Sequence, residues 1–252
     1  MAERHRSFKA EGIVIKHQDW GEADRIITVF TRELGKVRMV AKGARKIQSR
    51  KGGHVEPFTH ILAQLDRTSD LPIINQVETV EPFMELRDSL ENITVGLYVM
   101  ELLDRFTRDE EGEDLPLFQL LRETLLRLAA STDKWPVLCY FQLRLLDVLG
   151  YRPSLFHCAV CQRKIEPVDQ FFSPMQGGVV CPACGEKHPN LWKIQVEPLR
   201  FLRHFQRSTF DDAAKAQVHP AVREKIDKLI EDHLSFLLER KLNSPRFLNS
   251  IK

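Results

Sequence analysis

Four cysteines form the most specific chemical pattern in this sequence. Cys158 and Cys161 are separated by two residues, as are Cys181 and Cys184, and 19 residues lie between the two pairs. This spacing matches a tetrahedral zinc site of four thiolates, because each short turn lets both of its thiolates reach one ion. Four protein ligands leave no open position for water or substrate. The pattern therefore predicts one structural Zn²⁺ and argues against a zinc hydrolase.

Alternatives remain for the histidines and thiols around this pattern. Free or disulfide-linked cysteines would explain the same four residues without a metal. His157 and His188 flank the pairs and could replace one thiolate, although positions outside the ligand set are favoured for both. Cys139 lies among apolar residues and is expected to be a small buried side chain.

The second pattern is a basic stretch between Glu33 and Glu56 that contains no acidic residue. A flexible, glycine-flanked basic loop on a β-barrel suits a phosphate backbone, so this stretch predicts nucleic-acid binding. Trp20 and Phe58 lie in or near predicted loops and could stack on bases. The alternatives are a solvated basic face and a half-buried Trp20 at the barrel rim. The seven cations that we expect to contact nucleic acid are Lys36, Arg38, Lys42, Arg45, Lys46, Arg50 and Lys51.

Composition and missing motifs narrow the class of protein. Of the 252 residues, 43% are hydrophobic and 29% are charged, as in ordinary globular proteins. The longest apolar run, residues 95–100, is far shorter than the ~20 residues of a membrane span, and the charged first twelve residues lack a signal peptide's apolar segment. The sequence has no P-loop, nucleophile elbow, H-E-x-x-H motif or dinucleotide fingerprint. We therefore expect a cytoplasmic protein that is not an enzyme.

The basic stretch lies in a region that reads as β structure. Short β-branched runs occur at residues 12–15, 26–30, 37–41, 60–65 and 72–77, with turn signals between them. Five short strands joined by unequal loops fit a small closed barrel of the OB type, although a sandwich or an SH3-like barrel has the same strand count.

From Pro82 onward, apolar residues recur every three or four positions, which predicts helices. One helix follows Pro82, a second spans about 117–128, and a third runs from Trp135 to a C-terminal cap at Gly150. Further helices are expected at roughly 197–207 and 220–241. The predicted fold is α+β: an OB domain over residues 1–80, then a helical domain over residues 81–252 with a zinc-knuckle insert at about 155–190.

Together, these segments resemble the RecO family of bacterial recombination mediators, which act in DNA gap repair. The resemblance runs in order along almost the whole chain. Its segments are GIVI at 12–15, GEADRIITVFT at 21–31, GK at 35–36, AKGARK at 41–46, LGYRPSL at 149–155, FSPMQGG at 172–178 and CPAC at 181–184.

The resemblance implies an OB domain that binds single- and double-stranded DNA, with Trp20 and the seven cations as candidate contacts. It also implies annealing of complementary strands and, with the partner RecR, loading of RecA onto DNA coated by single-strand-binding protein. A nucleoid-associated location in the bacterial cytoplasm follows. The alternatives are a zinc-containing RNA-binding or transcription regulator and a metal-dependent nuclease.

The resemblance further implies a pocket in the helical domain for the acidic tail of single-strand-binding protein. Such a tail needs an apolar groove and nearby cations. Residues 81–157 carry 8 Lys and Arg against 14 Asp and Glu, a net −6, so the pocket must be a local basic exception. The candidates are Phe141, Arg144 and Leu145 on the third helix, and Arg246 near the C-terminus, although the same third-helix spacing also fits a buried core stripe.

Overall fold

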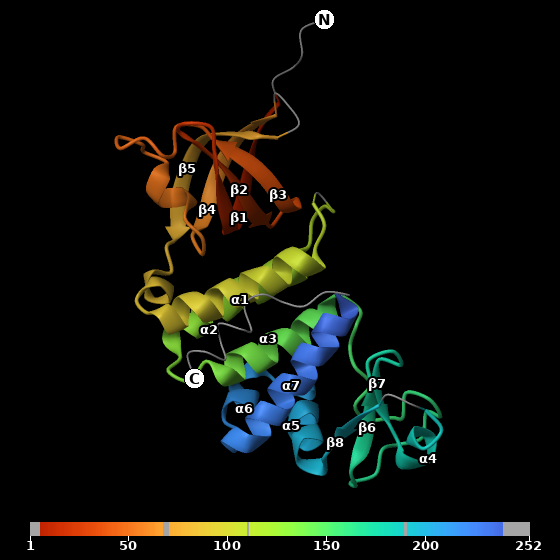
Figure 1. Cartoon of the computed structure of the whole chain (residues 1–252). Coiled ribbons are helices and arrows are strands. Elements are labelled where there is room, and N and C mark those ends of the chain that lie inside the picture. Colours follow the sequence, from red (N-terminus) through yellow and green to blue (C-terminus); the bar gives the residue numbers. More distant parts are fainter. Residues whose placement is uncertain (1–5, 68–70, 110, 189–190, 239–252) are drawn as a thin grey trace, which may run out of the picture. The chain divides into compact units, whose positions relative to one another are not determined.

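Five strands occupy residues 6–81 of the computed structural model, which describes residues 6–67, 71–109, 111–188 and 191–238 (Figure 1). Each predicted strand is present, and β1 is much longer than its β-branched core suggested because it curves round the barrel and pairs with two strands. The bounds are β1 Arg6–Trp20, β2 Asp24–Thr31, β3 Gly35–Ala41, β4 His60–Arg67 and β5 Ile73–Glu81.

The strands form a closed barrel in the order β1-β2-β3-β5-β4. Antiparallel pairing of β1 with β4 closes one side. On the other side β3 and β5 run parallel, and among the described residues they share the pair Val40↔Ile73. Alternating side chains such as Val14, Ile27 and Met39 fill the interior. The prediction of a five-stranded barrel of OB type is confirmed.

Two helices follow the barrel. Helix α1 spans Leu90–Phe106 and begins where the Ser89 side chain accepts a hydrogen bond from the backbone N–H of Asn92; α2 spans Leu115–Ala130. The helix expected directly after Pro82 starts later. Phe83 adopts a left-handed conformation (φ 46°) and a short 3-10 helix, η2 (Met84–Arg87), precedes α1.

The remaining helices are α3 (Trp135–Val148), α5 (Val196–Arg207), α6 (Phe210–Ala214) and α7 (Pro220–Leu237). Gly150 ends α3 as expected: its φ is 80°, and the N–H of Tyr151 donates to the carbonyl of Leu146. Between α3 and α5 lies a small sheet of β6 (Gln170–Ser173), β7 (Gly178–Val180) and β8 (Trp192–Ile194), with the one-turn helix α4 (Pro182–Gly185). This sheet is the predicted insert.

Packing divides the described chain into two compact units, one ending at Thr132 and one beginning at Asp133. The predicted division at residue 80 follows the change from strands to helices, whereas packing places α1 and α2 with the barrel. No helix in the described ranges is long and apolar enough to cross a membrane.

Candidate metal centre and nucleic-acid interface

The four cysteines converge on one point. The sulfurs of Cys158, Cys161, Cys181 and Cys184 all lie within 4.8 Å of one another, and those of Cys161 and Cys181 are 3.8 Å apart. Four thiolates about 2.3 Å from one tetrahedral zinc ion would lie about 3.8 Å from each other. The cluster therefore has the size and donor set of a four-thiolate metal site.

Backbone hydrogen bonds shape each cysteine pair into a tight turn. In the first turn, the N–H of Gln162 donates to the carbonyl of Cys158, and Gln162 takes a left-handed φ of 62°. In the second turn, the N–H of Gly185 donates to the carbonyl of Cys181. A Cβ on Gly185 would lie 2.2 Å from the Phe171 ring, so glycine lets this turn pack against β6.

Hydrogen bonds within the cluster act in opposite directions on two of its thiols. Burial opposes ionisation of the Cys158 thiol, but neighbouring backbone N–H groups, including that of Cys181, lower its pKa to about 6. The Cys184 thiol donates to the Cys161 and Cys181 sulfurs, which favours its protonated form and raises its pKa to about 12. A bound cation favours the thiolate form of all four.

The surroundings of the cluster agree with a structural site. His157 and His188 are exposed and do not belong to the four-residue cluster. Phe172 on β6 stacks on Trp192 of β8 and meets the edge of His233 on α7. Cys139 is buried in α3, and burial raises its pKa.

The basic loop lies between β3 and β4 and projects from the barrel (Figure 1). Two side chains fix its base to the core, because Ala44 and Val55 are both buried among the barrel's apolar residues. The Lys51 ammonium also donates to the carbonyl of Ile74 at 2.6 Å, and desolvation lowers the pKa of Lys51. The loop is therefore held at both of its stems.

Two aspartates at the ends of β1 and β2, on either side of the turn between these strands, hold the first half of the loop. The Asp24 carboxylate accepts a hydrogen bond from the N–H of Gly43 at 2.7 Å, and Asp19 forms an ion pair with Arg45 at 3.3 Å. These contacts could not be predicted from local sequence, because the acid-free run meets its counter-charges only through strand pairing. Arg45 is thus partly neutralised, and Lys51 is engaged with the backbone.

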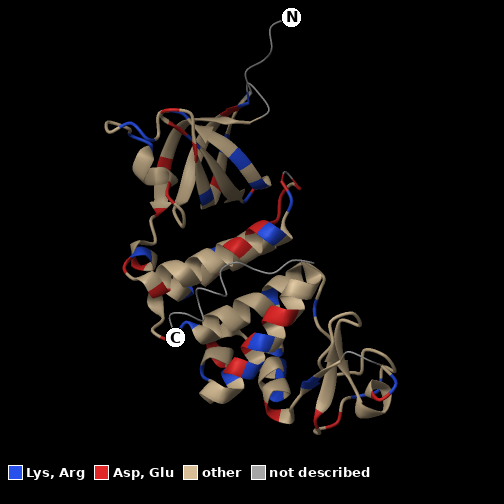
Figure 2. Cartoon of the chain, in the orientation of Figure 1, with Lys and Arg blue, Asp and Glu red and all other residues tan. Residues whose placement is uncertain are grey.

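Four cations, one on β3 and three on the basic loop, remain as candidate contacts for an anion (Figure 2). Arg38, Lys42, Lys46 and Arg50 are exposed, and none of them takes part in an ion pair within the part of the chain that the structure describes. An anion that approaches these four side chains meets charges that no ion pair within the described residues neutralises.

Trp20 belongs to the same surface. Its side chain is 55% exposed at the end of β1. Arg45 connects it to the loop, because this guanidinium pairs with Asp19 and donates to the carbonyl of Gly21, the two neighbours of Trp20. Phe58, in contrast, is buried and lies against Gly96 of α1, so the expectation that it stacks on bases is wrong.

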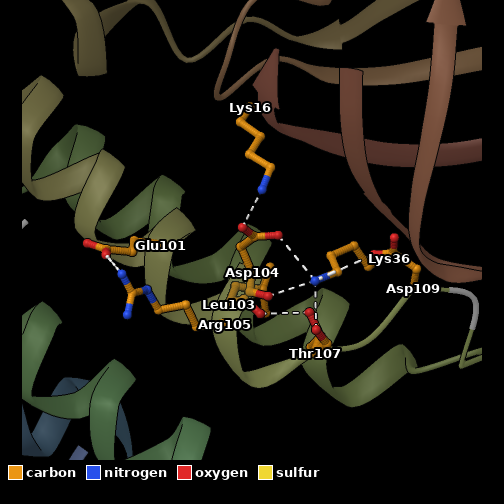
Figure 3. Close-up of polar contacts among 8 residues, drawn as sticks. All are labelled: Lys16, Lys36, Glu101, Leu103, Asp104, Arg105, Thr107 and Asp109. Atoms are coloured by element: carbon orange, nitrogen blue, oxygen red, sulfur yellow. Dashed lines mark hydrogen bonds and ion pairs between the residues drawn. The ribbon is translucent and has the colours of Figure 1, made fainter. Parts of the chain in front are cut away.

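Lys36 does not fit the predicted nucleic-acid contact. Its side chain is 8% exposed, and its ammonium donates to the backbone carbonyls of Asp104 and Thr107 and to the Asp104 carboxylate (Figure 3). Asp109 lies 3.6 Å away. Burial disfavours ionisation of Asp104, but Lys16 and Lys36 outweigh it and lower the pKa of this carboxyl. Lys36 therefore fastens the C-terminal end of α1 to β3.

The candidate tail-binding residues are also placed differently from the expectation. Phe141 and Leu145 lie on the buried face of α3, so they offer no surface for a peptide. Arg144 lies over the Tyr140 ring and donates to the carbonyl of Ser208 at 2.7 Å. Arg246 lies outside the described residues.

Comparisons with known proteins agree along the whole chain. The family model described as Recombination protein O N terminal matches residues 4–83, and that described as Recombination protein O C terminal matches residues 87–246. A protein named DNA repair protein RecO from Roseiflexus sp. (strain RS-1) is 36% identical over 99% of this chain and 87% of its own length. Proteins of the same name from Pelotomaculum thermopropionicum and Symbiobacterium thermophilum are 35% and 31% identical, over 96% and 97% of this chain and 93% and 98% of their own lengths.

Proposed function

The chain belongs to the RecO family, and from this premise we propose that it is a DNA-binding mediator of recombinational repair that anneals complementary strands. The observation that carries the proposal is a set of exposed cations on a loop anchored to an OB barrel, which form no ion pair with any described residue. Such a loop binds phosphates without reading base sequence. Trp20 beside it offers a ring on which unpaired bases stack, and stacking is worth about 1–3 kcal/mol per base.

The proposal extends to the partners of the family. The protein would bind single- and double-stranded DNA, act with RecR, and help to load RecA onto DNA covered by single-strand-binding protein. These steps exchange non-covalent contacts, so no catalytic residues are assigned. The four cysteines would hold one structural Zn²⁺ that stabilises the insert. The protein would work at the nucleoid, in the cytoplasm.

Neutralising the free loop cations tests the DNA surface. Replacing Lys42, Lys46 and Arg50 by Gln should weaken binding of an oligo-dT strand and slow annealing, because each lost phosphate contact lowers the affinity. The slope of log affinity against log salt should shrink by roughly 0.7 per contact on a single strand. Fluorescence anisotropy at several salt concentrations measures both quantities.

The matched control changes the same number of charges elsewhere. Lys164, Lys193 and Lys228 are exposed in the second unit, and replacing them by Gln should leave the slope unchanged. If both triple variants bind DNA equally well, the DNA surface is not on this loop. Equal affinity for RNA and DNA, with no annealing of protein-coated strands, would favour an RNA-binding regulator instead.

The tail of single-strand-binding protein needs a separate test. With Phe141 and Leu145 in the core, Arg144 and the C-terminal Arg246 remain as candidate cations. A fluorescent peptide of the acidic tail should bind more weakly to Arg144→Glu or to Arg246→Glu than to the parent, and Arg163→Glu, at an exposed position of the insert, serves as control. Unchanged binding by both would place the tail on another surface.

A further inference from the structure

Ile47 is an unusual residue for its position at the centre of a turn. It lies at the apex of the basic loop, where the N–H of Ser49 donates to the carbonyl of Lys46 at 2.9 Å and closes a four-residue turn. Ile47 and Gln48 are the two central residues of this turn, positions where Gly, Pro, Asn, Asp and Ser prevail. Yet the Ile47 side chain is fully exposed, more than any other large apolar side chain among the described residues. A β-branched apolar side chain here has no structural role in the free protein.

The turn that carries Ile47 is held rigidly. Lys46 donates its N–H to the carbonyl of Gly43, and the N–H of Arg45 donates to the carbonyl of Ala23 on the neighbouring turn. At the far stem, a Cβ on Gly52 would lie 2.8 Å from the Ala44 carbonyl oxygen, so the two stems are in close backbone contact. Little ordering entropy remains to be lost when such a loop binds a ligand.

Cations surround this apolar tip. Lys46 precedes Ile47 directly, and Lys42 and Arg50 lie on either side along the loop, all three exposed. Proteins that bend duplex DNA combine these two features: cations that bind the phosphates and an apolar wedge that enters a base step from the minor groove. An aliphatic side chain has no π face for stacking on a single strand, so Ile47 and Trp20 suit different forms of DNA.

We propose that Ile47 is an apolar wedge that inserts between neighbouring base pairs of duplex DNA and kinks it, while Trp20 serves single strands. The inference rests on the proposed DNA surface of the basic loop. The cations hold the backbone, and insertion of Ile47 partly unstacks one base step. A duplex loosened in this way is easier to separate or exchange, which is useful to a protein that re-pairs strands.

The test compares duplex and single-stranded DNA. Ile47→Ser in the full chain should bind a dye-labelled duplex of about 30 base pairs roughly tenfold more weakly, because the buried apolar area is lost. The end-to-end energy-transfer change that reports bending should disappear. The salt slope should stay that of the parent, since no phosphate contact changes. Affinity for oligo-dT should be unchanged, and Ile47→Leu should retain bending.

Val80→Ser is the matched control, because Val80 is an exposed β-branched residue on β5 of the same barrel. It should behave as the parent does. If Ile47→Ser bends and binds duplex as the parent does, or loses oligo-dT affinity to the same degree, the wedge is refuted. Failure of the wedge alone leaves the cation variants defective in DNA binding, whereas failure of the proposed function leaves those variants intact as well.

Discussion

The Lys36 ammonium joins the barrel to the end of α1 by contacts with two carbonyl oxygens and one carboxylate. We expect Lys36→Met to lower the free energy of unfolding by about 3 kcal/mol, because it leaves Asp104 and the helix carbonyls without their buried cation. Urea denaturation measures this loss. Lys16 contacts the same Asp104 carboxylate but is 58% exposed, so Lys16→Met should cost less than about 1 kcal/mol.

A DNA-binding assay distinguishes the structural role of Lys36 from the phosphate contact that the sequence predicted for it. Folded Lys36→Met protein should bind oligo-dT with the affinity and salt slope of the parent. A slope reduced by about 0.7 would instead show that Lys36 contacts a phosphate.

His233 provides a second prediction at the scale of one residue. It is 2% exposed, neither ring nitrogen has a hydrogen-bond partner among the described residues, and burial lowers its pKa to about 4. In the unfolded chain this histidine has its ordinary pKa of 6.5. Between pH 6.5 and 4 the unfolded chain therefore binds a proton at this ring, whereas the folded protein does not. Stability should therefore fall as the pH drops from about 6.5 to 4, by roughly 2–3 kcal/mol.

Replacement of this ring tests the assignment. His233→Leu should flatten the pH dependence of stability over that range, as measured by urea denaturation at several pH values. His157→Gln changes an exposed histidine and should keep the profile of the parent. An unchanged profile in His233→Leu would assign the acid sensitivity to other groups.

At the scale of elements, we expect that the insert formed by β6, β7, α4 and β8 folds only when the metal is bound. We expect one zinc per chain, and Cys181→Ser should abolish it and lower the free energy of unfolding by roughly 3 kcal/mol or more. Metal analysis and denaturation check both statements. Cys139→Ala, a cysteine outside the cluster, should retain the zinc. Protein purified without chelator that holds no zinc would contradict the prediction.

Local patterns predicted the elements well, and long-range packing explains what they missed. The cysteine cluster and the strands were predictable because ligand spacing and β-branched runs are local signals. The burial of Lys36 and Phe58 was not, because it depends on α1, which lies far along the chain from either residue. For Phe141 and Leu145, helical spacing fitted both core and surface, and the structure assigns them to the core.

At the scale of the whole molecule, packing predicts which fragment stands alone. Residues 1–132 contain the barrel, Lys36 and the two residues whose carbonyls accept from it, Asp104 and Thr107. Residues 1–83 contain Lys36 but neither of these acceptors. We expect fragment 1–132 to unfold cooperatively and to bind oligo-dT with the salt slope of the full chain. Fragment 1–83 should melt at a lower temperature in calorimetry. Equal melting temperatures would show that the barrel needs no helix.

The narrow β3–β5 seam gives the barrel a preferred place to open. The other neighbouring strands of the barrel share ladders of seven or more residue pairs, whereas β3 and β5 share Val40↔Ile73 in the described chain. Brief local opening should therefore start at this seam, and amide protons beside Val40 should exchange with heavy water sooner than those of β1. The barrel would then open between β3 and β5, while β1 on the opposite side stays paired with β2 and β4. The basic loop, which follows β3, lies next to the strands that separate.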